Sequence, residues 1–491
     1  MQQKYNDNKL SLMVCTILLL MLVGCGPGKT KNPLLTENNM LLVDGKAAFI
    51  LGLYENPKDD GRLKEATDAG FNLIMCPADK AALDRIDKAG AKAWINLGGA
   101  LDLGKNKERN RDRLLKLVNE FKGHPALLIW EGPDEYLWQQ WWGASSCIWK
   151  QVPEMQEMAR QQPELQPILE QLMELHGRAL WSKFDAKHIE FWQKSGRDMP
   201  NPQLRLGDMQ ENSRCAGEGL TRGIRAVKEA DPRHIVWLNH APRNSIEDLT
   251  LYGQAADMVG CDIYPVTPSA GHSDLANTSL SSVGAYTQRM RQPDDSKACA
   301  MVLQGFSFWD LPSFRNEEGR KEKEYRRPTF RETRFMAYDA IVRGANAIMY
   351  WGTDYVKDKQ ADKETMDTQL WRELLQTIRQ LRAIDQALTA PTAAPSPTVK
   401  LASGLGSATE KELPIMLKKT GADYVLIVVN EALTSQAFTI GHLPSELDGK
   451  TMYRLGGNES VVIKDRRFSD GIASFDVSVY ATSRRFEPPT K

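Results

Sequence analysis

Residues 125–142 read PALLIWEGPDEYLWQQWW, and this stretch joins an apolar run directly to acids and aromatic rings. The run PALLIW is continuously apolar rather than alternating, which is typical of a strand buried on both faces. Glu131, Asp134 and Glu135 follow within a few positions of three tryptophans. Core strands seldom end in this way. The stretch therefore predicts a buried strand whose end opens onto a catalytic mouth, a binding surface or an acidic loop.

Seven more apolar runs of this kind occur beyond about residue 46, three before this stretch and four after it. Helical stretches such as RLLKLVNEFKGHP and GIRAVKEADP lie between the runs. The runs read AAFILGLY, FNLIMCP, AKAWINLGG, HIVWLNHAP, DMVGCDIYPV, ACAMVLQGFSF and NAIMYWGTD. Eight strand-then-helix units predict an α/β fold, a (β/α)₈ TIM barrel, over residues 45–390. An open doubly wound sheet is the alternative, but no G-x-G-x-x-G follows the first strand.

Two segments interrupt or follow this alternation. Residues from about 137 to 215 are rich in Trp, Gln, Glu and Met, and we expect a helical insertion after strand four, on the side of the barrel that carries active sites. The Pro/Ala/Thr-rich stretch TAPTAAPSPT then predicts a linker at 391–399. Short alternating runs beyond it predict a C-terminal β-sandwich domain over residues 400–491.

The N-terminus reads as a targeting signal rather than as part of the fold. Lysines precede the apolar run LSLMVCTILLLMLVG, and Leu22-Val23-Gly24-Cys25 resembles a bacterial lipobox. In that family of signals the chain is cut before the cysteine, which is acylated. We therefore expect a signal peptide at 1–24, lipidation of Cys25 and a flexible tether at 25–44, with an uncleaved anchor as the alternative. The expected location is the bacterial cell envelope, at the outer membrane or the cell surface.

Composition sets limits on partners and cofactors. Lys+Arg and Asp+Glu both number 63, so net charge offers no argument for nucleic acid or for an anionic membrane surface, and the membrane is expected as a partner only through the lipid anchor. No C-x-x-C pair or regular spacing relates the remaining cysteines, which are Cys76, Cys147, Cys215, Cys261 and Cys299. We expect no metal and no cofactor, and the sequence leaves the oligomeric state open.

Polar and aromatic residues recur where the predicted strands end, and in a barrel those ends converge on one pocket. These residues are Tyr54, Glu55, Asn96, Glu131, Asp134, Glu135, Asn239, His240, Asp262, Tyr264, Gln304, Trp351 and Asp354. Rings stack on sugar faces, while acids and amides bind hydroxyl groups, so the set predicts a carbohydrate site. Ordinary structural roles are the alternatives: a barrel arginine as partner for Glu131, a rim hydrogen bond for His240 and core packing for Trp351.

Three further features carry a resemblance. Asp134-Glu135 in WEGPDEY, the helix and strand ETRFMAYDAIVRGANAIMYW and the closing SFDVSVYATSRRF are similar to the (β/α)₈ glycoside hydrolase superfamily. In that superfamily strand four ends in Asn-Glu or Asp-Glu, and the Glu is the acid/base. The resemblance covers about residues 45–491. It implies that Glu135 is the general acid of a glycosidase and that the other strand-end residues bind the substrate.

One position departs from the superfamily. Its retaining members carry a nucleophilic Glu at the end of strand seven, where this chain has Gln304 in MVLQGFSFWD. Three interpretations stay open: Asp262 acts as base or nucleophile, Asp354 or Asp310 does so, or the protein binds glycans without cutting them. If Glu135 and Asp262 are the pair, a separation of roughly 5–5.5 Å indicates retention and roughly 6.5–9.5 Å inversion.

The sequence thus supports an exported, lipid-anchored glycoside hydrolase, with Glu135 and Asp262 catalytic. A non-catalytic glycan-binding lipoprotein on the same scaffold is the second hypothesis, and a structural lipoprotein without a ligand is the third. The sugar, the linkage and the choice between endo and exo attack stay open.

Overall fold

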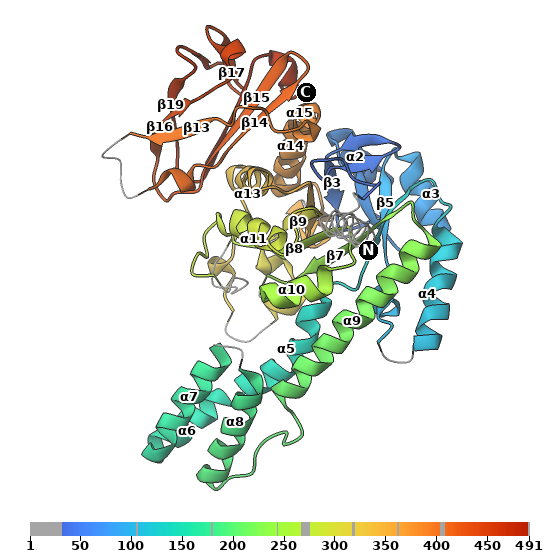
Figure 1. Cartoon of the computed structure of the whole chain (residues 1–491), viewed down its shortest axis with the longest axis vertical. Helices are drawn as coiled ribbons and strands as arrows, with labels where there is room; N and C mark the ends of the chain where they lie inside the picture. The colour runs from blue at the N-terminus through green and yellow to red at the C-terminus, as the bar shows by residue number, and fades with distance from the viewer. Residues whose placement is uncertain are drawn as a thin grey trace, which may run out of the picture.

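Eight parallel strands close into a barrel in the computed structural model of this chain (Figure 1). The structure describes residues 32–104, 107–177, 180–242, 244–266, 275–316, 320–360, 363–402 and 408–489. Residues 1–24 and Cys25, which carry the predicted signal, lie outside the described residues. Within the described residues, no helix has both the length and the apolar composition needed to cross a bilayer.

The barrel strands coincide with the eight apolar runs. They are β3 (Ile50–Leu53), β4 (Leu73–Cys76), β5 (Lys92–Asn96), β6 (Leu127–Glu131), β7 (Ile235–His240), β8 (Met258–Ile263), β9 (Ala298–Gln304) and β10 (Ala347–Trp351). The last strand, β10, pairs with both β9 and β3, with Ala347 opposite Ile50, so that the sheet has no edge. The predicted TIM barrel is confirmed, and the open sheet is wrong.

Alternate side chains of each strand enter two different cores. On β7, Trp237 points into the barrel and meets Trp94 with ring centroids 5.8 Å apart, whereas Val236 and Leu238 pack against the outer helices. Strands β8 and β9 approach so closely that a Cβ at Gly260 would lie 1.6 Å from the carbonyl oxygen of Ala300. Because each strand is buried against a core on both faces, both faces are apolar and the runs are continuous in sequence.

Helices form the outer layer of the barrel. They are α2 (Asp60–Ala69), α3 (Lys80–Lys88), α4 (Lys107–Phe121), α9 (Leu206–Ala230), α10 (Ile246–Gly253), α11 (Ser282–Arg291), α13 (Phe330–Val342) and α14 (Gln369–Ala383). Capping side chains set several starts: Asp59 accepts from the first turn of α2, and Thr329 forms a capping box with Glu332 at α13. Smaller elements are β1 (Leu41–Val43), β2 (Lys46–Ala48), α12 (Pro312–Arg315), β11 (Asp358–Gln360), β12 (Lys363–Thr365) and α15 (Asp385–Thr389).

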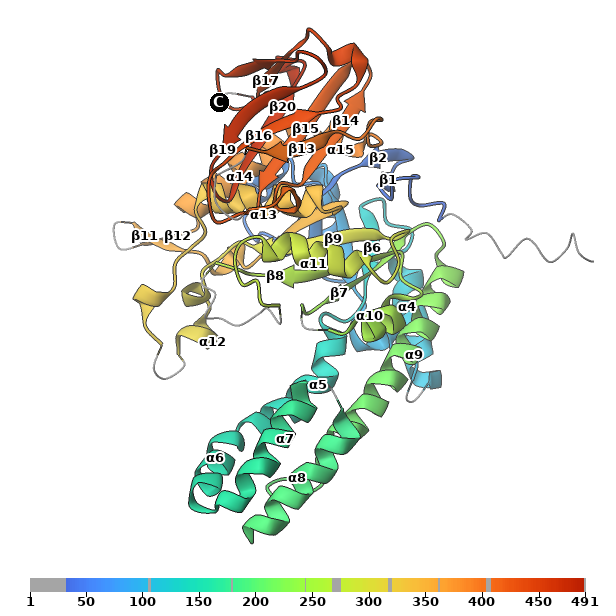
Figure 2. The ribbon, with the colours of Figure 1, turned by 60° about the vertical axis from the view of Figure 1, so that its left-hand side comes forward.

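The segment after β6 forms a helical arm that projects from the barrel (Figures 1 and 2). It consists of α5 (Tyr136–Trp149), α6 (Val152–Gln161), α7 (Gln166–Gly177) and α8 (Trp181–Ser195), which share a small apolar core. Helix α9 starts in the arm, where Asp185 accepts from the backbone N–H groups of Leu206 and Gly207 at 2.9 and 2.7 Å. It then continues without a break into the outer layer of the barrel. One helix therefore belongs to both the insertion and the barrel.

The C-terminal region is a sandwich of two antiparallel sheets. One sheet holds β13 (Thr398–Leu401), β16 (Gln436–Gly441) and β19 (Phe468–Ile472). The other holds β14 (Ile415–Thr420), β15 (Asp423–Asn430), β20 (Asp476–Ala481), β17 (Thr451–Arg454) and β18 (Ser460–Val462). Phe468 meets Tyr480 across the two sheets with ring centroids 5.2 Å apart, so the predicted β-sandwich is confirmed.

A buried acid lies where α13 meets the sandwich. Asp339 is fully enclosed, accepts from the backbone N–H of Gly284 at 2.7 Å and hydrogen-bonds the carboxyl group of Glu431. Arg343 holds Glu431 through two nitrogens, each 2.6 Å from a carboxylate oxygen. Burial first, and then the charge of Glu431, raise the pKa of Asp339 well above its ordinary value.

The raised pKa of Asp339 predicts a pH-dependent stability. The folded protein keeps a proton that the unfolded chain releases, so this contribution is lost as the pH rises from the ordinary value of 3.8 through the folded pKa. In Asp339→Asn, the amide can still accept from Gly284 and can donate to Glu431. We expect the variant to unfold a few degrees above the unmodified protein at pH 8, with a smaller difference at pH 5. Thermal unfolding at both pH values checks this, and an equal or lower midpoint at pH 8 would contradict it.

Candidate active site

The carboxyl ends of β3 to β8 bring six of the predicted site residues into one hydrogen-bonded network. Tyr54 follows β3, Asn96 ends β5, Glu131 ends β6, Asp134 lies on the loop after it, Asn239 is near the end of β7 and Asp262 is on β8. All of these strand ends lie on the same side of the barrel because the strands are parallel.

Glu131 lies behind the mouth of the barrel, where no part of it is exposed. Its Oε2 accepts from Trp94 Nε1 at 3.0 Å and from Asn96 Nδ2 at 2.9 Å, and its Oε1 accepts from the Tyr54 hydroxyl. Burial, with a contribution from the charge of Asp134, raises the pKa of Glu131 to about 8. Neutral donors surround Glu131, and the alternative barrel-arginine partner is not found among the described residues. The contact of Glu131 with substrate stays a prediction.

Glu135 and Asp262 form a pair in which the two carboxyl groups are hydrogen-bonded to each other. Burial is the first cause that raises the pKa of both groups, and for Asp262 the neighbouring charge of Glu135 comes next. Two carboxyl groups in contact cannot both ionise readily, so the pair holds one proton.

The backbone places Glu135 in an uncommon conformation. Its φ of 46° lies in the left-handed region, and its N–H donates to the carbonyl oxygen of Asn239 at 3.2 Å. A non-glycine residue in this backbone conformation destabilises the fold by about 1–3 kcal/mol, and it persists where the surrounding structure holds it. The turn directs Glu135 across the mouth toward Asp262 on β8. It is partly exposed, whereas Asp262 is 5% exposed.

Asn239 and Asp134 connect Glu131 and Tyr54 to the pair formed by Glu135 and Asp262. Asn239 Nδ2 donates to Asp134 Oδ1 at 2.8 Å and lies 3.4 Å from Asp262 Oδ1. Tyr54 lies 3.1 Å from the same oxygen of Asp134. Asp134 is exposed at the mouth, and its carboxyl group also accepts from the backbone N–H of Glu135. Burial, opposed by these three donors, raises the pKa of Asp134 above its ordinary value.

Aromatic rings line the neighbouring sector of the mouth. Tyr264 stacks on Trp351 with ring centroids 5.6 Å apart and planes inclined by 23°. Trp351 is only partly buried, and Tyr355, which lies 5.8 Å from it, is 44% exposed. The sequence analysis missed Tyr355, although it follows Asp354 directly in the loop after strand eight. Trp351 and Tyr355 are thus two rings that a ligand could contact.

Gln304 has a structural role. It is fully buried, accepts from the backbone N–H of Val266 at 2.9 Å, and donates to the carbonyl oxygens of Val266 and Phe306 at 3.3 and 3.0 Å. These bonds hold the loops after β8 and β9 together. The contact of Gln304 with substrate stays a prediction, for a side chain whose oxygen and nitrogen are both bonded to the backbone.

The other acids near the mouth have partners elsewhere. Glu55 accepts from the N–H of Gly352, and from the N–H and hydroxyl of Thr353 at 3.0 and 2.9 Å. Burial, followed by the charge of Asp354, raises the pKa of Glu55 to about 7. Asp354 thus belongs with Glu55 rather than with Glu135. Asp310 is paired with Arg327 at 2.7 Å.

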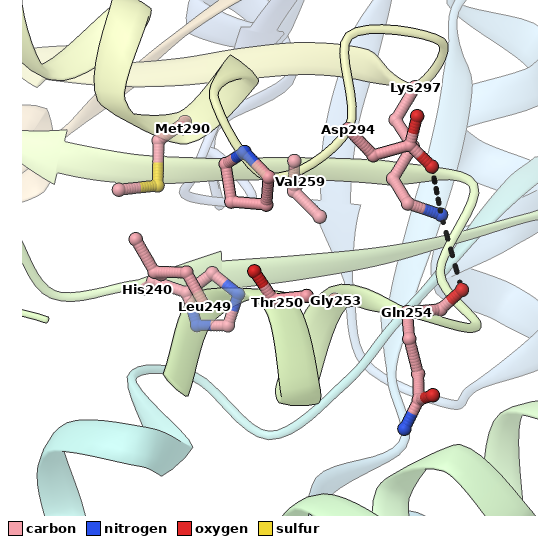
Figure 3. Close-up of a pocket in the computed structure, with 10 residues that line it drawn as sticks. His240, Leu249, Thr250, Gly253, Gln254, Val259, Met290, Asp294 and Lys297 are labelled. Carbon is pink, nitrogen blue, oxygen red and sulfur yellow. Dashed lines mark hydrogen bonds and ion pairs between the residues drawn. The ribbon is translucent and has the colours of Figure 1, made fainter. Parts of the chain in front are cut away.

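His240 does not join the mouth. Its ring lies 6.5 Å from that of Tyr252 on α10 and lines a separate cavity of about 130 Å³ between α10 and α11 (Figure 3). Both ring nitrogens are buried without a hydrogen-bond partner, and burial lowers the pKa of His240 to about 4. His240 is the last residue of β7 and alternates with Asn239, so it faces the helices rather than the site. The predicted substrate-binding role of His240 is not supported.

The chemistry of Gln304 gives a prediction about stability. In Gln304→Glu, a carboxyl group would replace the amide donor that serves two backbone carbonyl oxygens, leaving buried acceptors facing one another. We expect a loss of about 1–3 kcal/mol in the free energy of unfolding, measured by urea titration at pH 7. Gln193→Glu on the exposed face of α8 is the matched control. Unchanged stability of Gln304→Glu would show that these bonds are not needed.

Comparison with known proteins places this architecture among solved structures. No protein-family model matches the chain, and no curated protein matches its sequence. A β-galactosidase from Bacillus circulans sp. alkalophilus has a TM-score of 0.50 at 9% identity, with 89% of this chain and 99% of that chain covered. A glycoside hydrolase family 5 protein from Bacteroides vulgatus ATCC 8482 has a TM-score of 0.50 at 11% identity, with 91% and 92% covered. This chain therefore has the TIM-barrel fold of these glycoside hydrolases.

Proposed function

We propose that this protein is a glycoside hydrolase that cleaves glycosidic bonds of an oligo- or polysaccharide with carboxyl groups as catalysts. The hydrogen-bonded pair of Glu135 and Asp262 carries the proposal, since two carboxyl groups in contact resist losing both protons and the pKa of each is raised. A carboxyl group that is protonated at the mouth can protonate a leaving glycosidic oxygen. The shared fold with a β-galactosidase and a family 5 glycoside hydrolase supports the same class.

Exposure assigns the roles within the pair. Glu135 is partly exposed and delivers the proton to the leaving oxygen as the bond to the anomeric carbon breaks. Asp262 is nearly enclosed, so we assign it the role of keeping the shared proton on the pair until Glu135 delivers it, rather than attack on the sugar. Asp134, which is exposed at the mouth, is then the second carboxylate, which stabilises charge at the anomeric carbon or accepts a proton from water. Trp351 and Tyr355 offer the stacking surface for the sugar.

Glu135→Gln tests this assignment directly. An amide keeps the shape of the group but carries no acidic proton, so we expect kcat to fall by about 10²–10⁴-fold while sugar binding is retained. Hydrolysis by the soluble form, starting after Cys25, is measured on a panel of aryl glycosides and bacterial, plant and host polysaccharides. Proton NMR of the first product anomer then distinguishes retention from inversion.

The control is Glu164→Gln, an exposed acid of the arm, which we expect to hydrolyse at the unmodified rate. Unchanged turnover in Glu135→Gln would remove Glu135 from the mechanism. Hydrolysis that is lost only in this variant would establish the enzyme and identify its sugar.

Glycan binding without cleavage is the second candidate function. Gln304 favours it, because the resemblance to the superfamily leads one to expect a nucleophilic Glu at that strand end and the amide is instead bonded to the backbone. Equal sugar binding by the unmodified protein and by Glu135→Gln, with no hydrolysis by either, would support this function over the enzyme.

We further propose that the protein is anchored to the cell envelope through acylated Cys25. The lipobox-like Leu22-Val23-Gly24-Cys25 after an apolar run supports this. Cys25→Ala is expected to move the protein from the membrane fraction, which detergent dissolves, to the fraction that is soluble without detergent. It should also abolish the mass increase due to acyl chains. Mass spectrometry of the N-terminal peptide measures both the cleavage site and the acylation. An unmodified Cys25 in the membrane fraction would contradict the proposal.

A further inference from the structure

The Tyr54 hydroxyl has one hydrogen and two carboxylate neighbours. It contacts Glu131 Oε1 and lies 3.1 Å from Asp134 Oδ1. An ionised carboxylate only accepts hydrogen bonds, so one tyrosine hydrogen cannot serve both acids at once. Both contacts contain a hydrogen only when one acid is protonated and donates to the Tyr54 oxygen. Counting hydrogens thus places an extra proton in this part of the network.

Surroundings decide which acid holds the proton. Glu131 is fully enclosed, and its second oxygen already accepts from Trp94 and Asn96, so a proton on Oε1 faces Tyr54. Burial raises the pKa of Asp134 as well, but its carboxyl group accepts from Asn239 and from the backbone N–H of Glu135, and these donors favour its ionised form. The raised pKa of Glu131, about 8, agrees with this placement.

No positive charge compensates these acids in the described part of the chain. The titratable groups that face Glu131 are Tyr54 after β3 and Asp134 after β6, and Asp262 of β8 lies beyond Tyr54. None of the ion pairs formed by the described residues includes Glu131, Asp134 or Asp262. When Glu131 ionises, only neutral donors of the network can therefore reorient toward the new charge.

We propose that Glu131 is a proton-holding positioning residue that sets the direction of the Tyr54 hydroxyl and thereby the state of Asp134. With Glu131 protonated, its O–H donates to Tyr54, and the Tyr54 O–H donates to Asp134. When Glu131 loses its proton to solvent, the Tyr54 hydrogen turns to Glu131. Asp134 then loses a donor and faces a buried anion. Only the O–H bond of Glu131 breaks, and Tyr54 keeps one proton throughout.

The effect on catalysis rests on the proposed function, with Asp134 as the second carboxylate. Loss of the Tyr54 donor makes the charge on Asp134 less favourable, so activity should fall as Glu131 ionises. Glu131→Gln reproduces the protonated arrangement, since its carbonyl oxygen can accept from Trp94 and Asn96 while its NH₂ donates to Tyr54. The variant should therefore fold normally and keep the hydroxyl turned toward Asp134 at every pH.

The first test is the pH profile of kcat/KM on the sugar found in the hydrolysis screen. We expect Glu131→Gln to act within about threefold of the unmodified rate at pH 6 and to move the alkaline limb upward by at least about one pH unit. Tyr54→Phe should lower the rate and abolish the effect of Glu131→Gln in the double variant. Asp339→Asn, another buried acid replaced by its amide, should keep the unmodified profile. An alkaline limb that Glu131→Gln leaves in place would overturn the proposal.

The second test does not depend on activity. Infrared difference spectra between pH 6 and pH 10 report protonated carboxyl groups through their carbonyl stretch. We expect one such band in the unmodified protein to titrate near pH 8 and to be missing in Glu131→Gln. Identical spectra would overturn the proton on Glu131. A band that disappears in the variant, in a protein that hydrolyses no sugar, would retain the proton-holding role and reject the proposed function instead.

Discussion

Closure of the barrel through the pairing of β10 with β3 is the constraint on which the rest of the structure depends. It joins the first and last strands, so that segments far apart in sequence end around one opening. Tyr54 from the first strand then reaches Glu131 from the fourth, and Asn239 from the fifth reaches Asp262 from the sixth. The rings that fill the barrel, among them Trp94 and Trp237, form the floor under this network, and Trp94 also donates to Glu131.

Neutral donors, rather than cations, hold the acids of the mouth. A carboxylate that is buried among tyrosine, tryptophan and asparagine donors keeps its hydrogen bonds but lacks an opposite charge, so its proton is retained to a higher pH. Burial raises the pKa of Glu131, and burial together with the neighbouring acid raises the pKa of Asp262 and of Glu135. Asp134 accepts from Asn239, from Tyr54 and from the backbone N–H of Glu135, and these donors favour its charged form although burial raises its pKa. The site thereby has both a proton to give and a carboxylate to face substrate, the two properties that glycosidic cleavage needs.

The regions outside the barrel strands use similar chemistry for a structural purpose. Asp339 and Glu431 meet where α13 packs on the sandwich, and Arg343 supplies the cation that the mouth lacks. The arm is tied to the barrel by α9, whose start is capped by Asp185 and whose end packs in the outer layer. Both regions therefore pack on helices of the barrel's outer layer.

The sequence by itself determined the fold, because strands buried on both faces must be continuously apolar and eight of them alternate with amphipathic helices. It also indicated that Asp134, Glu135 and Asp262 lie at strand ends on one side. Only the tertiary structure decided which strand-end side chains meet. Gln304 and His240 stand at strand ends too, yet Gln304 bonds to the backbone of two loops and His240 faces α10. Side chains alternate across a strand, and loop paths set the remaining directions, so a strand-end position alone does not say whether a group is exposed, paired or protonated.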